Sequence, residues 1–95
     1  MRDGISIKGM SEEWRRREGE KSNKLIRARM TEQMGDPDLA MRLYAEVAAE
    51  EEQIRDYCRS LGLMEKAYIN SVSAASCWAA AGDLHRALQQ YDALI

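Results

Sequence analysis

The sequence predicts an all-α domain of four helices that form two antiparallel helical hairpins, and three observations predict it. The chain has one proline and no phenylalanine, and no stretch alternates between apolar and polar residues as a half-buried strand does. Apolar residues recur instead at helical spacing. Gly-Asp pairs divide the helical stretches at residues 35–36 and 82–83. A length of 95 residues fits one such domain.

A first helix is expected over about 11–34. Ser11 precedes two glutamates, and a serine N-cap followed by acids satisfies free amides and opposes the helix dipole. Gly19 costs about 1 kcal/mol inside a helix, so we expect a bend there, or good order only after Ser22. An apolar stripe then follows Leu25 and consists of Ile26, Met30 and Met34.

The other three helices are expected over about 37–61, 64–81 and 84–95. Asp36 can cap the second helix with its side chain. Pro37 then takes the first helical position, where the amide hydrogen that proline lacks is not needed. Asp83 caps the fourth helix in the same way. The third helix is rich in small side chains and is expected to lie at the centre. Residues 1–10 are predicted to be a flexible segment before a single domain over residues 11–95.

Two stretches of the sequence repeat at an offset of 47 residues: "GDPDLAMRLYAEVA" (35–48) and "GDLHRALQQYDALI" (82–95). Glycine lets the chain reverse, aspartate restarts a helix, and a small alanine allows close helix packing. The repeat therefore predicts two equivalent hairpins. The paired positions are Gly35 with Gly82, Asp36 with Asp83, Ala40 with Ala87, Met41 with Leu88, Tyr44 with Tyr91 and Val47 with Leu94.

This pattern resembles the second half of the tetratricopeptide repeat, and Ala75 and Trp78 match the small residue and the aromatic of its first helix. The offset of 47 exceeds the family's period of about 34, and the first helix of the earlier unit matches only at Ala28. The resemblance implies elongated helical hairpins that bind polypeptides. It also implies that Arg29, Gln33 and Ser76, on the inner helices, contact a partner. Residues 64–95 are similar as well to three-helix modules of the microtubule-interacting-and-transport type.

Nothing in the sequence indicates catalysis, and we expect a protein that is not an enzyme and holds no metal or cofactor. The single histidine, His85, falls in the first turn of the fourth helix, and the glutamates around residue 50 have no Glu-x-x-His partner. Glu51 interrupts the apolar stripe of the second helix. Its carboxylate either faces solvent at a helix crossing or is buried beside a cation, and we expect the first.

The sequence also predicts where the protein resides. Cys58 and Cys77 form no CxxC pair, which fits a reducing compartment. No apolar run approaches the roughly 20 residues that span a bilayer. A cytoplasmic location is expected.

Charge is unevenly distributed: residues 1–30 carry nine Lys/Arg and five Asp/Glu, whereas residues 31–95 carry five and eleven. A basic helical face beside Trp14 could hold phosphate, which makes a nucleic-acid-associated regulator the alternative function. The interleaved acids favour instead a solvated face, or a patch that docks on an acidic surface such as the second helix of another copy. The candidate anion-binding residues are Arg15, Arg16, Arg17, Lys21 and Lys24.

The fourth helix ends the repeat with large apolar residues that no following helix covers. Stacked helical hairpins leave such a face for the next unit. Another copy, packed about a twofold axis, or a helix of another protein would cover it, and we expect a homodimer or higher oligomer. The sequence thus predicts a non-enzymatic protein–protein interaction module, a small helical-repeat adaptor or regulatory subunit. The candidate contacts at this open end are Leu88, Tyr91, Leu94 and Ile95.

Overall fold

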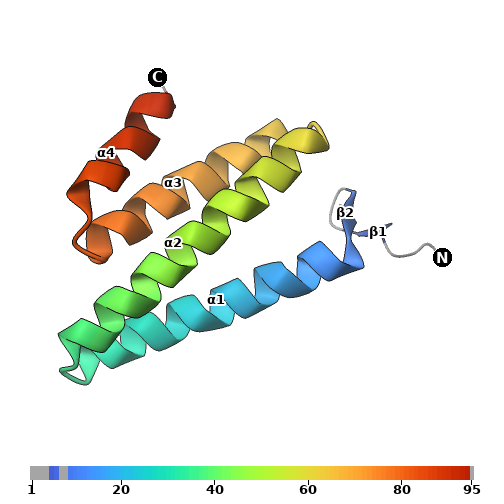
Figure 1. The fold of residues 1–95 in the computed structure, drawn as a ribbon. Coiled ribbons are helices and arrows are strands. Elements are labelled where there is room, and N and C mark those ends of the chain that lie inside the picture. The colour runs from blue at the N-terminus through green and yellow to red at the C-terminus, as the bar shows by residue number, and fades with distance from the viewer. Residues whose placement is uncertain (1–4, 7–8, 95) are drawn as a thin grey trace.

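The computed structural model describes residues 5–6 and 9–94 and confirms the all-α class (Figure 1). Two two-residue strands precede four helices. The helices are α1 (Glu12–Gln33), α2 (Pro37–Ser60), α3 (Met64–Ala80) and α4 (Leu84–Ala93). Their ends lie within two residues of the predicted ones. None of the helices in the described part of the chain is long and apolar enough to cross a membrane.

The strands β1 (Ile5–Ser6) and β2 (Met10–Ser11) pair antiparallel in front of α1, a feature that the sequence did not predict. Met10 is fully buried and packs against Ile54, Cys58 and Ala67. The predicted flexible segment therefore does not extend to Met10. For residues 1–4 and 7–8 that prediction lies outside the described residues.

Local chemistry sets the helix boundaries as expected. The side chains of Asp36 and Asp83 accept hydrogen bonds from amides three residues on, at 3.2 and 3.1 Å. Ser11 caps α1 in the same way, with a distance of 3.3 Å to the amide of Trp14. Gly35 and Gly82 follow helix ends with φ angles of 90° and 86°, the left-handed region that favours glycine. The two turns of the repeat thus have the same backbone geometry.

The first helix differs from its prediction in two ways. It is helical without a break from Glu12 through Gly19, and not only after Ser22. Its apolar stripe faces solvent, since Ile26, Met30 and Met34 are 52, 54 and 82% exposed. The buried residues of α1 are Lys21 and Ala28, so this helix packs through a polar and small-residue face.

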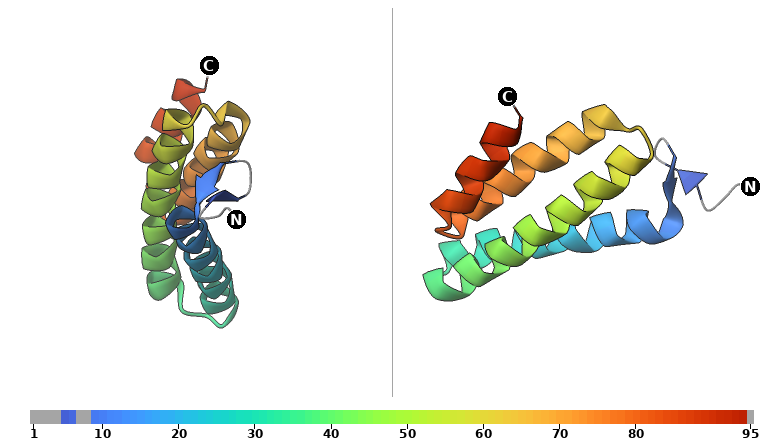
Figure 2. Two further views of the ribbon diagram at one scale, coloured as in Figure 1. Left: turned by 90° about the vertical axis from the view of Figure 1, so that its right-hand side faces the viewer. Right: turned by 45° about the horizontal axis from the view of Figure 1, so that its top comes forward.

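Each helix packs mainly against its sequence neighbours, and α3 lies between α2 and α4. The Cα atoms span 45 × 30 × 13 Å, which makes the molecule a flat slab. Figure 2 shows α1 and α3 towards one face of the slab, and α2 and α4 towards the other. The slab therefore has two edges, formed by α1 and α4.

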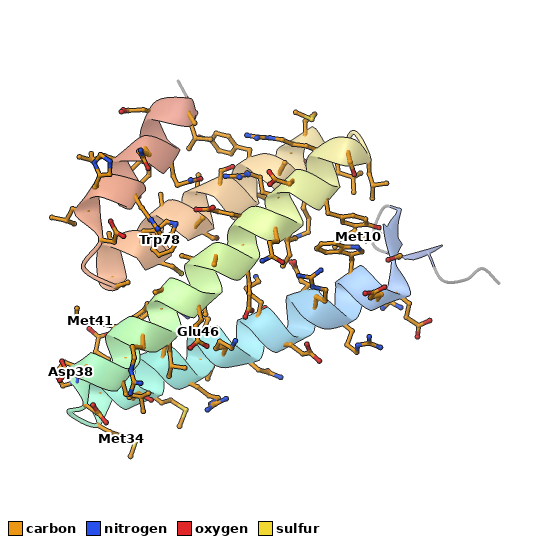
Figure 3. All side chains as sticks on the ribbon, in the orientation of Figure 1. Met10, Met34, Asp38, Met41, Glu46 and Trp78 are labelled. Atoms are coloured by element: carbon orange, nitrogen blue, oxygen red, sulfur yellow. The ribbon has the colours of Figure 1, made fainter. Side chains whose placement is uncertain are left out.

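Two apolar clusters hold the slab together. One lies around the repeat turns and includes Ala40, Ala87 and Trp78, and the two alanines are only 2 and 4% exposed. Figure 3 shows Trp78 near α4 and Met10, from the other cluster, beside the start of α1. Close packing at Ala40 and Ala87 is the role that the repeat predicts for these positions.

We expect Gly19→Ala and Gly35→Ala to change stability in opposite directions. A Cβ at either position meets no atom within 4 Å. Gly19 is helical, so alanine should raise the free energy of unfolding by up to about 1 kcal/mol. At Gly35, with φ of 90°, alanine should lower it by about 1–2 kcal/mol.

Urea denaturation followed by circular dichroism measures both changes. Stabilisation by Gly35→Ala would contradict the left-handed turn, and destabilisation by Gly19→Ala would contradict a continuous α1.

Candidate functional site

A buried polar contact joins the three long helices at the middle of the slab. Lys21 of α1 and Glu51 of α2 form an ion pair of 3.1 Å between Nζ and Oε2. Asn70 of α3 donates a hydrogen bond of 2.8 Å from Nδ2 to Oε1 of Glu51. The Lys21, Glu51 and Asn70 residues are 7, 2 and 2% exposed. Both carboxylate oxygens of Glu51 are therefore satisfied in the interior.

This contact corrects two predictions from the sequence. Glu51 does not face solvent at a helix crossing but is buried beside a cation, the other arrangement considered. Lys21 is not an exposed anion ligand, because Glu51 neutralises it in the core. Isolated charges are too costly to bury, and their pairing makes the site tolerable.

Lys24, one turn after Lys21 on the basic face of α1, lies against the acidic face of α2. Lys24 bridges Glu46 and Glu50 at 3.2 and 2.6 Å. The hydrogen bond to Glu50 is the main reason that the pKa of Lys24 is raised. Lys24 thus pairs with the second helix of its own chain, whereas one of the two alternatives from the sequence named the second helix of another copy. Figure 3 shows Glu46 on α2.

Trp14 is also engaged within the chain. Its ring stacks on Tyr57 at 4.3 Å with an interplanar angle of 6°, and the Arg17 guanidinium lies 4.0 Å from the ring centroid. Arg17 donates a further hydrogen bond to Gln53. Two flat groups this close to one ring occupy opposite faces of it, so no open indole face is left for a base.

Arg16 is exposed, and Arg15 is partly buried. A polar hollow of about 560 Å³ lies between α1 and α2. Cations and acids alternate around it, which is a poor surface for a polyanion. The charged residues that line the hollow are Arg17, Glu20, Lys24, Arg27 and Glu50.

A second groove, of about 350 Å³, lies between α1 and α3. Tyr44 of α2 contributes to its lining, and its hydroxyl donates a hydrogen bond of 2.8 Å to Glu32 of α1. Burial and this hydrogen bond raise the pKa of Tyr44. The lining mixes apolar surface with a cation and three hydroxyls. The lining residues are Leu25, Arg29, Tyr44, Val72, Ser73, Ser76, Cys77 and Ala80.

The groove contains two of the three residues that the family resemblance implied. Arg29 and Ser76 stand 47 positions apart, so they are equivalent in the repeat, and both line the groove. Gln33 is exposed one turn beyond Arg29 and does not line it. Sequence reasoning missed Val72 and Ser73. Val72 and Ser73 lie one turn before Ser76 on the same helix, and this spacing could have indicated that they share its face.

Cys77 also lines this groove, although it is only 5% exposed. Burial raises the pKa of the Cys77 thiol to about 11. The thiolate is the reactive form of cysteine, so this group contributes packing surface and not nucleophilic chemistry. Among the described residues, no group of three His, Cys, Asp or Glu side chains could hold a metal ion.

The open end predicted at α4 is exposed along one stripe. Leu88 and Tyr91 are 61 and 42% exposed, and Leu94 is half-buried. Ile95 lies outside the described residues. Tyr91 differs sharply from its repeat equivalent Tyr44, which is 7% exposed because α3 packs beside it.

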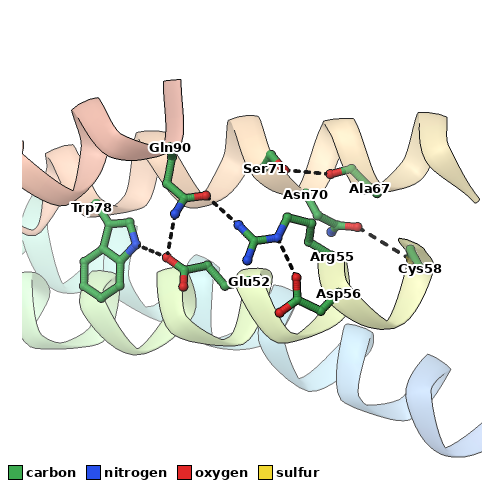
Figure 4. Close-up of polar contacts among 9 residues, drawn as sticks. All are labelled: Glu52, Arg55, Asp56, Cys58, Ala67, Asn70, Ser71, Trp78 and Gln90. Atoms are coloured by element: carbon green, nitrogen blue, oxygen red, sulfur yellow. Dashed lines mark hydrogen bonds and ion pairs between the residues drawn. The ribbon is translucent and has the colours of Figure 1, made fainter. Parts of the chain in front are cut away.

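Away from the exposed stripe, Gln90 of α4 forms hydrogen bonds to two residues of α2 (Figure 4). Glu52 accepts one from Trp78 Nε1 at 2.6 Å and another from Gln90 Nε2 at 3.1 Å. Arg55 donates to Gln90 Oε1 at 2.7 Å. Because these contacts fix the rotation of α4 about its axis, the exposed stripe has a defined direction.

Comparisons with protein families, with curated proteins and with solved structures give no match. The resemblance to tetratricopeptide repeats therefore stays a prediction.

We expect the single variants Lys21→Met and Glu51→Gln each to lower the free energy of unfolding by about 3–5 kcal/mol, because each leaves one buried charge without its counter-charge. The double variant should cost less than the sum by at least about 1 kcal/mol, since it removes both charges and keeps an amide oxygen for Asn70.

A double-mutant cycle by urea denaturation measures this coupling. A matched cycle at the exposed pair Arg86 and Asp83, whose Nε and Oδ2 lie 3.5 Å apart, should give about 0–1 kcal/mol. Additive effects at Lys21 and Glu51 would rule out a buried pair.

Stability should fall as the pH rises through the window between the unfolded and folded pKa values of Cys77, from 9.0 to about 11. In this window the unfolded chain loses the thiol proton while the folded protein keeps it, so ionisation favours unfolding. The two-unit difference corresponds to about 2–3 kcal/mol.

Chemical denaturation of the wild-type protein and of Cys77→Ala across this pH range isolates the effect. The stability difference between them should shrink by that amount as pH rises. Parallel curves would show that the thiol titrates normally in the folded state.

Proposed function

We propose that this chain is a non-enzymatic protein–protein interaction module, a small helical-repeat adaptor or regulatory subunit. It holds a polypeptide segment in the groove between α1 and α3 and associates with itself through the edge at α4. The observation that supports the first role is that Arg29 and Ser76, equivalent positions of the repeat, line the same groove.

The groove has the chemistry of a peptide site. Leu25, Val72 and Ala80 offer apolar surface to side chains of the segment, whereas Ser73 and Ser76 offer hydroxyls to its backbone. Arg29 is exposed and can pair with a carboxylate on the segment. These groups would therefore bind a peptide segment that is mainly apolar and carries one acidic residue.

The open stripe of α4 supports the second role, because burial of large apolar side chains drives association. The free cysteines Cys58 and Cys77 support a cytoplasmic location for the proposed module. The nucleic-acid alternative has less support, since Arg17, Lys21 and Lys24 contact residues of the same chain.

We expect the double variant Arg29→Glu/Ser76→Trp to lose its peptide partner, because it reverses the charge of the groove and fills it. The wild type and the variant, each immobilised as the full chain, are compared by quantitative mass spectrometry of proteins captured from the native cell. A captured partner should then be measured directly, and its affinity should fall at least about tenfold, which is 1.4 kcal/mol.

The matched control is Arg42→Glu/Ser60→Trp, the same two changes at exposed positions of α2 outside the groove. Circular dichroism checks that both variants fold. Capture of the same proteins at the same level by the groove variant and by the control would refute the proposed groove.

A further inference from the structure

Two apolar stripes are exposed, one on each edge of the slab. The α1 stripe consists of Ile26, Met30 and Met34, with exposed fractions of 52, 54 and 82%. The α4 stripe consists of Leu84, Leu88 and Tyr91, with exposed fractions of 64, 61 and 42%. Figure 1 shows α1 and α4 at opposite edges, and Figure 3 shows Met34 pointing away from the slab. One chain therefore cannot cover one stripe with the other.

The internal repeat shows what kind of element covers such a stripe. In the first hairpin Tyr44 and Val47 are 7 and 0% exposed, and they belong to one buried cluster with Cys77 of α3. Their equivalents in the second hairpin are Tyr91 and Leu94, which are more exposed. In the first hairpin, α3 covers this face of α2. Among the described residues, no helix covers the equivalent face of α4. That face suits the first helix of another hairpin.

The α1 helix of a second copy is such a helix. Met30 of α1 is the repeat equivalent of Cys77 of α3, since 47 positions separate them. Placing α1 of a second copy beside α4, as α3 lies beside α2, would bring Met30 against Tyr91 and Leu94. Met30 already faces outward, so this contact requires no rearrangement.

The charges that flank the two stripes are complementary. Arg27 and Arg29 are exposed beside the α1 stripe, whereas Asp92 is exposed beside Tyr91 on α4. Contact of α1 with α4 places these opposite charges near one another. A twofold contact between two α4 helices would not gain this attraction between Asp92 and the arginines of α1.

We propose that copies of this chain join head to tail, with the α1 stripe of one copy on the α4 stripe of the next. This inference rests on the self-association in the proposed function, and it names the surfaces and their symmetry. Such a contact pairs two different surfaces, so a pair of copies keeps one free stripe of each kind, one at either end. The product is a chain of copies that grows with concentration, not a dimer closed by a twofold axis.

Two blocked variants test the proposal by sedimentation. Leu88→Asp/Tyr91→Asp disables the α4 stripe, and Met30→Asp/Met34→Asp disables the α1 stripe. All four residues are more than 40% exposed, so the fold should persist, and circular dichroism checks this. Met64→Asp is the control: Met64 is 60% exposed and begins the 17-residue α3, beyond the reach of the 10-residue α4.

The wild type and Met64→Asp should show an average mass that rises with concentration from the 10.8 kDa of one chain. Each blocked variant alone should remain at the mass of one chain. An equimolar mixture of the two blocked variants should form a one-to-one complex of twice that mass, because each supplies the stripe that the other lacks.

Three results would overturn the proposal. A mixture that stays monomeric excludes a contact between the two stripes. A discrete dimer that survives Met30→Asp/Met34→Asp but not Leu88→Asp/Tyr91→Asp shows twofold pairing of α4, which keeps self-association and removes the head-to-tail contact. A wild type that is monomeric at all concentrations removes self-association as well, and the groove between α1 and α3 is tested separately by its own variants.

Discussion

The buried contact among Lys21, Glu51 and Asn70 is the constraint on which the arrangement of the three long helices depends. It lies between the two apolar clusters and takes one group from each of α1, α2 and α3. A charge at this depth requires its partner at hydrogen-bond distance, so the helices have little freedom to slide or rotate past one another. The groove between α1 and α3 exists because this contact fixes both helices against α2.

The same constraint explains how the uneven charge of the chain is used. The first helix presents Lys21 and Lys24 to the glutamates of α2, and its apolar stripe is left outside. Ion pairs therefore contribute to the packing of α1 on α2, in addition to the apolar contact of Ala28. The two hairpins share a turn geometry at Gly35 and Gly82 but differ in the chemistry of the first helix, which gives the slab two unlike edges.

The sequence predicted the helices well because their boundaries are decided locally, by the caps at Asp36 and Asp83 and by the glycines before them. The family resemblance named Arg29 and Ser76, and both line the groove between α1 and α3. The sequence could not predict that Lys21 is buried, since a lysine on a polar face looks the same whether it meets water or Glu51 of another helix. The β1–β2 pair was missed because strands of two residues have no periodicity to detect.

Packing of each helix mainly against its neighbours in the sequence has a consequence for folding. Contacts between elements that are close along the chain require only short loops to close, so little entropy is lost before the first contacts form. The pair of α2 and α3 has the most extensive interface of the neighbouring helices, and it is the natural nucleus. The outer helices can then add from either side, which makes assembly of this domain a stepwise growth from its middle.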